Sequence, residues 1–262
     1  MKYPDDFINK IICGDCLEVM KDIPDKSIDM ILCDLPYGTT ACKWDTIIPF
    51  ESLWKQYKRI IKNNGAIVLT ASQPFTSALV MSNIKMFKYE WIWDKKTTTN
   101  AFTAHKMPMK AHENICVFGN KINYYPQKES WSSEQIKRMR YKTVVIEHSK
   151  YESNKNSRMI IQGRDMKVAS GRFPQSVIRI NGIAKMSKIE EIVHPTQKPV
   201  ALFEYLIKTY TNEKDLVLDN CAGSGTTGVA CQNLNRNFIL IEKEKKYCEI
   251  AKQRLRQEIL PL

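Results

Sequence analysis

The chain has 262 residues, 43% of them hydrophobic, and a formal net charge of +12 at pH 7. That apolar share is ample for a buried core and excludes an intrinsically disordered chain. The basic balance favours a polyanionic partner, nucleic acid first, with a solvated basic surface as the alternative. No apolar stretch approaches the roughly eighteen residues that span a bilayer, so we expect no membrane partner.

The cysteines indicate a reducing compartment. Eight of them are scattered through the chain without the spacing of a disulfide framework, and no secretory signal segment is evident. We therefore expect a cytoplasmic protein with reduced thiols. Cys13 and Cys16 form the only C-x-x-C in the sequence. Because a structural zinc site needs a second pair of ligands, we predict no metal site.

Short apolar runs alternate with amphipathic segments through the first 119 residues. The apolar runs predict buried strands, and they lie at residues 10–13, 28–33, 66–71, 89–93 and 114–118. The amphipathic segments predict helices, and they lie at residues 16–23, 50–62 and 74–86. This alternation is typical of an α/β protein with a parallel, doubly wound sheet.

The run at 28–33 ends abruptly in Asp34, Leu35, Pro36 and Tyr37. Ligands of open α/β sheets bind just beyond the carboxyl ends of the strands, where Asp34 would lie. Pro36 stiffens the loop by fixing its own φ and by restricting the residue before it. A carboxylate and a flat ring on a stiff loop can hold a planar molecule with an amino group. The alternative is a simple strand-ending turn with a half-buried Tyr37.

The alternation fails between residues 120 and 193. This stretch carries 15 Lys or Arg against 7 Asp or Glu, which is +8 of the net +12. Aromatic residues are interleaved with the basic ones, at Tyr124, Tyr125, Trp131, Tyr141, Tyr151 and Phe173. Cations for phosphates and rings for bases are typical of a nucleic-acid surface. A solvated insertion is the alternative.

The alternation resumes after residue 193. The predicted helices and strands lie at 202–210, 215–218, 238–241 and 245–259. Gly223, Gly225 and Gly228 form a G-x-G-x-x-G pattern between a strand and a helix, and Glu242 ends the next strand. Glycines let a backbone approach a ligand, and an acid at that position takes both hydroxyls of a ribose. The segment predicts a nucleoside-type cofactor, with a merely tight turn as the alternative.

The glycine pattern alone allows NAD as readily as S-adenosylmethionine (SAM). Three features favour SAM. Asp219 precedes the loop, where it could help hold the ammonium-bearing end of that cofactor. The loop that begins at Asp34 ends a different strand of the same predicted sheet. The basic segment implies a substrate far larger than that of a typical dehydrogenase.

The sequence from Asp34 to Tyr37 resembles the Asp-Pro-Pro-Tyr catalytic motif of the amino-group DNA methyltransferases, with Leu35 in place of the first proline. Three further segments match that family in order. The segment from Gly14 to Cys16 resembles its element near the cofactor adenine. The segment from His194 to Pro199 resembles its segment beside the methionine moiety, and the segment from Asp219 to Gly228 resembles its cofactor loop, with Glu242 as the ribose-binding acid. The chain is similar to the permuted β class over nearly its whole length.

The resemblance implies a fold and a division of the chain. The implied fold is a Rossmann-like SAM-dependent methyltransferase fold, circularly permuted, with a doubly wound, mostly parallel α/β sheet. Residues 1–119 would form the catalytic half of the domain, and residues 194–262 would form its SAM-binding half. Residues 120–193 lie where this family carries its target-recognition insertion.

The resemblance also implies site residues. The catalytic residues would be Asp34, Pro36 and Tyr37. The cofactor-binding residues would be Asp15, Cys16, Asp34, Thr196, Lys198, Asp219, Ala222, Gly223, Ser224, Gly225, Thr226, Thr227 and Glu242. Lys43, Trp44 and Asp45 are candidates to cover a flipped base, with ordinary packing of Trp44 as the alternative. An initial Asp accompanies N6-adenine targets in this family, whereas Ser accompanies N4-cytosine, so Asp34 implies adenine.

The expected function is a site-specific DNA methyltransferase that moves a methyl group from SAM to N6 of an adenine flipped out of duplex DNA. The alternatives are another amino target (N4 of cytosine, an RNA base or a glutamine side chain), an inactive nucleic-acid-binding module and, more distantly, a dehydrogenase. The expected partner is double-stranded DNA, with a homodimer and a restriction endonuclease as further candidates. The expected setting is the cytoplasm, near the nucleoid, with a bacterial or phage origin.

Overall fold

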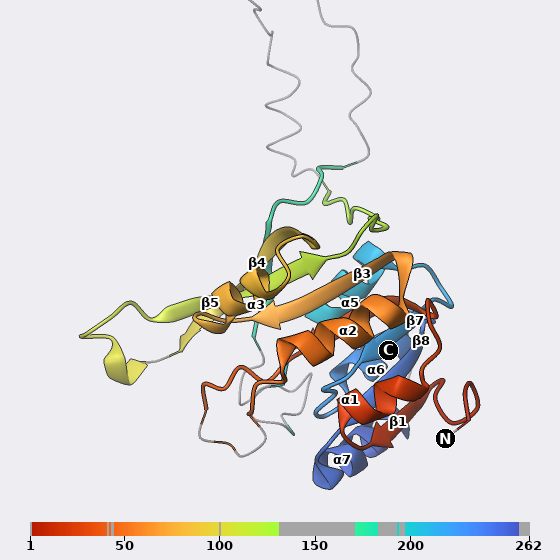
Figure 1. Ribbon diagram of the computed structural model, residues 1–262. Coiled ribbons are helices and arrows are strands. Elements are labelled where there is room, and N and C mark those ends of the chain that lie inside the picture. Colours follow the sequence, from red (N-terminus) through yellow and green to blue (C-terminus); the bar gives the residue numbers. More distant parts are fainter. Residues whose placement is uncertain are drawn as a thin grey trace, which may run out of the picture. The chain divides into compact units, whose positions relative to one another are not determined.

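The computed structural model describes residues 2–40, 42, 45–99, 101–130, 171–182, 193 and 197–256. The chain divides into two compact units, Met1–Tyr125 with Gln175–Leu262, and Pro126–Pro174. The larger unit holds a mixed sheet with helices on both faces (Figure 1). In the smaller unit, Glu129 and Arg172 form an antiparallel bridge and an ion pair of 2.5 Å. No described helix is long and apolar enough to cross a membrane.

The described strands are β1 Lys10–Cys13, β2 Ile28–Asp34, β3 Ile61–Ala71, β4 Phe87–Thr99, β5 Lys110–Phe118, β6 Val177–Arg179, β7 Leu216–Asp219 and β8 Asn237–Glu242. They form one sheet in the order β1-β8-β7-β2-β3-β5-β4-β6. Neighbouring strands run parallel except at β5, which is antiparallel to both β3 and β4. The predicted α/β fold with a mostly parallel sheet is confirmed.

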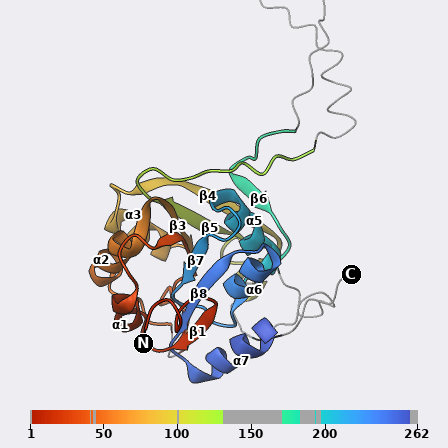
Figure 2. The same ribbon diagram turned by 90° about the vertical axis from the view of Figure 1, so that its right-hand side faces the viewer.

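The described helices are α1 Cys16–Val19, α2 Phe50–Ile60, α3 Phe75–Ser82, α5 Val200–Tyr210, α6 Thr226–Asn233 and α7 Lys245–Arg256. Helices α1, α2 and α3 pack on one face of the sheet, and α5 and α6 pack on the other (Figure 2). Strand β2 serves both layers, because its side chains alternate between the two faces. Ile31 and Cys33 join the first layer, and Met30 and Leu32 join the second.

Strands β2 and β7 lie side by side at the centre of the site. Met30 pairs with Val217 and Ile31 pairs with Leu218, all in parallel register. The chain leaves β2 towards α2 on one face and leaves β7 towards α6 on the other. Because the two connections diverge, they leave a crevice at the carboxyl ends of these strands, where ligands of such sheets bind.

The strands predicted at 89–93 and 114–118 are parts of longer ones. β4 and β5 pair from Phe87 and Phe118 to Thr99 and Lys110. The pairing of β5 with β3 stops before that, at the pair of Asn114 with Ala71. The two strands therefore continue as a hairpin beyond the end of β3 (Figure 1). Backbone pairing needs no apolar side chains, so the Thr- and Lys-rich part of this hairpin carries no hydrophobic signal that would extend the predicted strands.

Other boundaries differ in smaller ways. Strand β6 lies within residues 120–193 and pairs with β4, but three residues are too few to give a periodic pattern. The helix predicted at 16–23 is α1 followed by a 3-10 turn, Met20–Asp22. The helix predicted at 74–86 ends at Ser82, and α7 ends at Arg256 within the described residues.

Candidate active site

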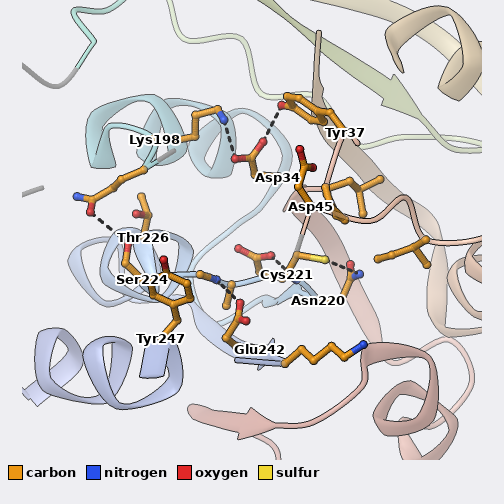
Figure 3. A pocket seen from close by; sticks show the side chains of 18 of the residues that line it. Asp34, Tyr37, Asp45, Lys198, Asn220, Cys221, Ser224, Thr226, Glu242 and Tyr247 are labelled. Atoms are coloured by element: carbon orange, nitrogen blue, oxygen red, sulfur yellow. Dashed lines mark hydrogen bonds and ion pairs between the residues drawn. The ribbon is translucent and has the colours of Figure 1, made fainter. Parts of the chain in front are cut away.

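A cavity of about 590 Å³ lies at the carboxyl ends of β1, β2, β7 and β8 (Figure 3). It brings together most residues that the sequence predicted for the site: Asp15, Cys16, Asp34, Pro36, Tyr37, Lys198, Asp219, Ala222, Gly223, Ser224, Thr226 and Glu242. Gly225 and Thr227 are not part of its lining. Thr196, Lys43 and Trp44 lie outside the described residues.

Asp34, the last residue of β2, is engaged at both carboxylate oxygens. Oδ1 accepts hydrogen bonds from the Tyr37 hydroxyl, at 2.7 Å, and from the Thr70 hydroxyl. Oδ2 forms an ion pair with Lys198 Nζ at 2.6 Å (Figure 3). Lys198 was predicted as a cofactor-pocket residue, and the structure places its amine on the predicted catalytic carboxylate.

Packing holds the loop that follows Asp34. The Tyr37 ring stacks on Phe75, with centroids 5.2 Å apart and an interplanar angle of 28°. Burial, together with the charges of Asp34 and Glu113, raises the pKa of Tyr37 well above its usual value, so its hydroxyl stays a neutral donor. Leu35 is 4% exposed and packs in the core under α1, α2 and α3. The apolar core therefore anchors the position where the family motif has proline.

Asp45 clamps the same loop from the other side. Its Oδ1 accepts from the Gly38 N–H at 2.8 Å, and its Oδ2 accepts from the N–H groups of Thr39 at 2.9 Å and Thr40 at 2.7 Å. Burial alone would raise the pKa of Asp45, but hydrogen bonds from the Thr40 hydroxyl and from these N–H groups hold it below its usual value. Of the three residues predicted to cover a flipped base, the structure describes Asp45, and Asp45 fixes the loop after Tyr37.

The carboxylate of Glu113, on β5, and the amine of Lys95, on β4, also line the cavity, and neither residue was predicted from the sequence. Glu113 Oε1 lies 2.6 Å from Lys95 Nζ, and Oε2 lies 3.4 Å from Lys198 Nζ. Burial alone would raise the pKa of Glu113, but Lys198 and Lys95 hold it below its usual value. Burial alone would lower the pKa of Lys198, but Asp34 and Glu113 hold it above its usual value. Glu113 is therefore ionised and Lys198 is protonated at neutral pH.

Glu242, at the end of β8, lines the side of the cavity where the sequence predicts the cofactor. Its Oε2 accepts from the Gly223 N–H and its Oε1 accepts from the Glu244 N–H, both at 2.8 Å. Burial raises the pKa of Glu242, and these backbone hydrogen bonds offset part of the rise. An ionised carboxylate has about four lone-pair sites, so each oxygen keeps an acceptor for a ribose hydroxyl. These two acceptors fit the two hydroxyls of the ribose in SAM.

Two of the three pattern glycines serve packing rather than ligand approach. Gly225 caps α6 with a φ of +80°, and a Cβ there would lie 2.9 Å from the Ala251 Cβ of α7. A Cβ on Gly228 would lie 2.8 Å from side-chain atoms of Leu240 and Leu255. Gly223 alone of the three lines the described cavity, where its N–H holds Glu242. Gly223 is thus the one of the three that lies where its backbone can approach a ligand in the described cavity, and the cofactor contact of Gly225 stays a prediction.

Asp219 holds the glycine-rich loop against the end of β7. It is 2% exposed, its Oδ1 accepts from the Cys221 N–H at 3.1 Å, and its Oδ2 accepts from the Thr227 hydroxyl. Burial raises the pKa of Asp219 to about 7, although these hydrogen bonds act in the opposite direction. Asp219 also lines the cavity. Its contact with the ammonium group of a cofactor stays a prediction.

Asp15 and Cys16 reach the cavity from the start of α1. Asp15 Oδ1 accepts from the Leu17 N–H at 2.9 Å and so caps the helix, while Cys16 is its first, buried residue. Ser224 Oγ donates to Gln197 Oε1 at 3.2 Å, which links the glycine loop to the segment before α5. In the part of the chain that the structure describes, no group of three or more His, Cys, Asp or Glu could hold a metal ion.

The cavity lies where doubly wound α/β sheets bind their ligands, with Glu242 and Asp34 both in its lining. The chain matches the DNA methylase family over residues 28–253, and it belongs to that family. The resemblance inferred from the sequence motifs is thereby confirmed.

Several known proteins are similar to this chain. Type II methyltransferase M.HpaI of Haemophilus parainfluenzae is 28% identical over 261 residues, which cover 95% of this chain and 74% of the relative. Type II methyltransferase M.HinfI of Haemophilus influenzae is 29% identical over 283 residues, which cover 96% of this chain and 69% of the relative.

Two solved structures share the fold. The M1.HpyAVI–SAM complex superposes with a TM-score of 0.59 at 25% identity, over 94% of this chain and 99% of the other. The cytosine-N4-specific PvuII DNA methyltransferase superposes with a TM-score of 0.63 at 16% identity, over 96% and 87%. At 16% identity, the similarity to the PvuII DNA methyltransferase concerns the fold only.

We expect Asp45→Ala to loosen the loop after Tyr37, because it removes the acceptor of three backbone N–H groups. Hydrogen bonds to charged groups contribute about 1.5–3 kcal/mol, so the free energy of unfolding should fall by about 2 kcal/mol or more. Urea denaturation measures the change. Asp25→Ala is the control, since Asp25 is 70% exposed in its pair with Arg59 and such pairs contribute little. Equal stability losses in the two variants would contradict the clamp.

A second prediction concerns pH. Folding raises the pKa of Asp219 from 3.8 to about 7, so the unfolded chain loses this proton first and the contribution of Asp219 to stability falls between about pH 4 and pH 7. Asp219→Asn stays neutral throughout. We expect the Tm of the variant minus that of the wild type to increase from pH 4 to pH 8. Thermal melts across this range measure the difference, and a constant value would show that Asp219 does not titrate in this way.

Proposed function

We propose that this DNA methyltransferase uses SAM to methylate N6 of adenine in a specific site of duplex DNA. The observation that carries the proposal is the position of Asp34, at the cavity and hydrogen-bonded to Tyr37 at 2.7 Å. In the family that the sequence resembles, an initial Asp accompanies adenine and Ser accompanies cytosine. The M1.HpyAVI complex with SAM supports the choice of cofactor.

The chemistry needs a stronger nucleophile than a free aromatic amine, whose lone pair is delocalised into the ring. Asp34, with a backbone carbonyl of Leu35 or Pro36, would accept the N–H bonds of the amine. That favours a more tetrahedral nitrogen and stabilises the positive charge that develops on it. SAM, when bound, supplies an electrophilic methyl group on a positively charged sulfur. These acceptors would also orient the amine towards the methyl group. Holding two reactants in this way lowers the activation barrier, because the entropic cost of bringing them together is met on binding.

Tyr37 would hold the base itself. The target amine lies inside the duplex stack, so the adenine must flip out to reach the cavity. Stacking on an aromatic ring contributes about 1–3 kcal/mol per base. Phe75 supports the Tyr37 ring by stacking on it, so a base would lie on the opposite side of that ring.

The hairpin of β4 and β5 offers a DNA contact near the same edge of the sheet. It runs past the end of β3, whose Thr70 pairs with Asp34. Phe102 at its tip is 97% exposed, and Lys96 and Lys106 on the same hairpin are exposed as well. An exposed ring between cations suits a contact with bases and phosphates. Residues 120–193 stay the predicted target-recognition region. The homodimer and the restriction endonuclease partner also stay predictions.

The test of the function is an incubation of the purified protein with methyl-labelled SAM and unmethylated genomic DNA, followed by mass spectrometry of the nucleosides. We expect N6-methyladenine. Asp34→Ala should abolish transfer, because it removes the acceptor of the amine, while SAM binding stays within about threefold of the wild type. N4-methylcytosine would overturn the choice of base. Absence of label in DNA and RNA, with no SAM binding, would favour the inactive binding module.

Phe102→Ala should weaken binding to duplex DNA by about fivefold or more, since a base–aromatic contact contributes about 1–3 kcal/mol. Fluorescence anisotropy with a labelled duplex that contains the methylated site measures the Kd. Met81→Ala is the matched control, because Met81 is a large, 71% exposed apolar side chain on α3. Equal affinities of the wild type and the Phe102 variant would exclude the hairpin tip from the interface.

A further inference from the structure

The carboxylate that methyl transfer needs as an acceptor is paired with a cation. Asp34 Oδ1 is taken by the hydroxyls of Tyr37 and Thr70, and Oδ2 is taken by Lys198 Nζ at 2.6 Å. Lys198 is 7% exposed, so water does not screen this pair. A protonated amine beside Asp34 would also repel the positive charge that develops on the target nitrogen. Oδ2 keeps a second lone pair, but an amine bound there would lie beside the Lys198 ammonium. Under the proposed function, this repulsion favours a Lys198 that has left Oδ2 when the reaction takes place.

A second acceptor for this cation lies next to it. Glu113 Oε2 is 3.4 Å from Lys198 Nζ and makes no hydrogen bond to any residue that the structure describes. The Glu113 side chain is 13% exposed, and leaving a buried acceptor unsatisfied costs about 1–3 kcal/mol. A charge-assisted N–H···O bond measures about 2.8 Å, so a movement of about 0.6 Å would satisfy Oε2.

The position of Glu113 is fixed by its other oxygen. Oε1 pairs with Lys95 Nζ at 2.6 Å, and that nitrogen also lies 5.6 Å from the centroid of the Trp93 ring. Both partners are largely buried, at 12% and 13% exposure. A buried charge that loses its partner is strongly destabilising. Glu113 thus offers Lys198 a place to go without becoming unpaired.

We propose that Lys198 moves from Asp34 to Glu113 when the target amine enters the cavity, and that Glu113 is a positioning residue for methyl transfer. The move frees Asp34 Oδ2 to accept an N–H of the amine. It also shifts the positive charge of Lys198 away from the nitrogen that is becoming cationic. In this proposal Glu113 acts on the reaction through its contact with Lys198. This inference rests on the proposed function only in needing an exocyclic amine, whether of adenine or of cytosine.

The test is Glu113→Gln, which keeps the size of the side chain and removes its charge. We expect the single-turnover rate of methyl transfer to fall by roughly tenfold or more, because Lys198 stays on Asp34. The Kd values for SAM and for the duplex should change by less than about threefold. Glu90→Gln is the control: Glu90 is exposed on β4, accepts from Asn114 Nδ2 at 2.9 Å and is not part of the cavity lining.

Two further variants separate positioning from a structural role. Glu113→Asp keeps the charge and should recover part of the rate. In a Lys198→Met background, Glu113→Gln should cause no further loss, since the cation that it positions is gone. A wild-type rate in Glu113→Gln, a parallel loss of SAM and DNA binding, or additive losses in the double variant would each overturn the proposal. An inactive wild type would instead contradict the proposed function, as the same assay shows.

Discussion

The parallel pairing of β2 with β7 is the constraint on which the site depends. It joins Met30 and Ile31 to Val217 and Leu218, from opposite ends of the chain. Each strand ends in an aspartate at the same edge, Asp34 on β2 and Asp219 on β7. The helices that follow lie on opposite faces, so the two connections diverge from the shared edge and leave a crevice there. The predicted catalytic motif, early in the chain, and the predicted cofactor loop, late in the chain, therefore line one cavity.

The two halves of the cavity are built by different means. On the cofactor side, backbone N–H groups of Gly223 and Glu244 hold the acid, and close packing at Gly225 fixes the loop. On the catalytic side, side-chain charges hold one another, from Lys95 through Glu113 and Lys198 to Asp34. Backbone donors cannot change partner without unfolding the loop, whereas a lysine can rotate between two carboxylates. The rigid half suits a cofactor and the exchangeable half suits a reacting base.

The sequence could predict those residues that end a recognisable strand. Asp34 and Glu242 follow apolar runs, and the parallel-sheet rule alone places them at one edge. Lys95 and Glu113 have a weaker signal of the same kind. Continuing the period of two from the buried Trp91 and Trp93 reaches Lys95, and continuing it backwards from Val117 and Ile115 reaches Glu113. Asp45 has no such signal, since its role depends on a folded loop that brings its carboxylate to the N–H groups of residues 38–40. The pairing of Lys198 with Asp34 joins segments that no local pattern connects.

The energetics of the linked ion pairs, from Lys95 through Glu113 and Lys198 to Asp34, argue for a role in function rather than in stability. Removing four charged groups from water costs several kcal/mol per ion, and good pairing at best restores the balance. Apolar side chains of similar volume would pack between β4, β5 and the start of α5 at lower cost. Instead, Glu113 keeps one oxygen without a hydrogen bond among the described residues, 3.4 Å from a lysine already paired elsewhere. Such a locally suboptimal arrangement beside the predicted catalytic carboxylate is consistent with a lysine that exchanges between two carboxylates.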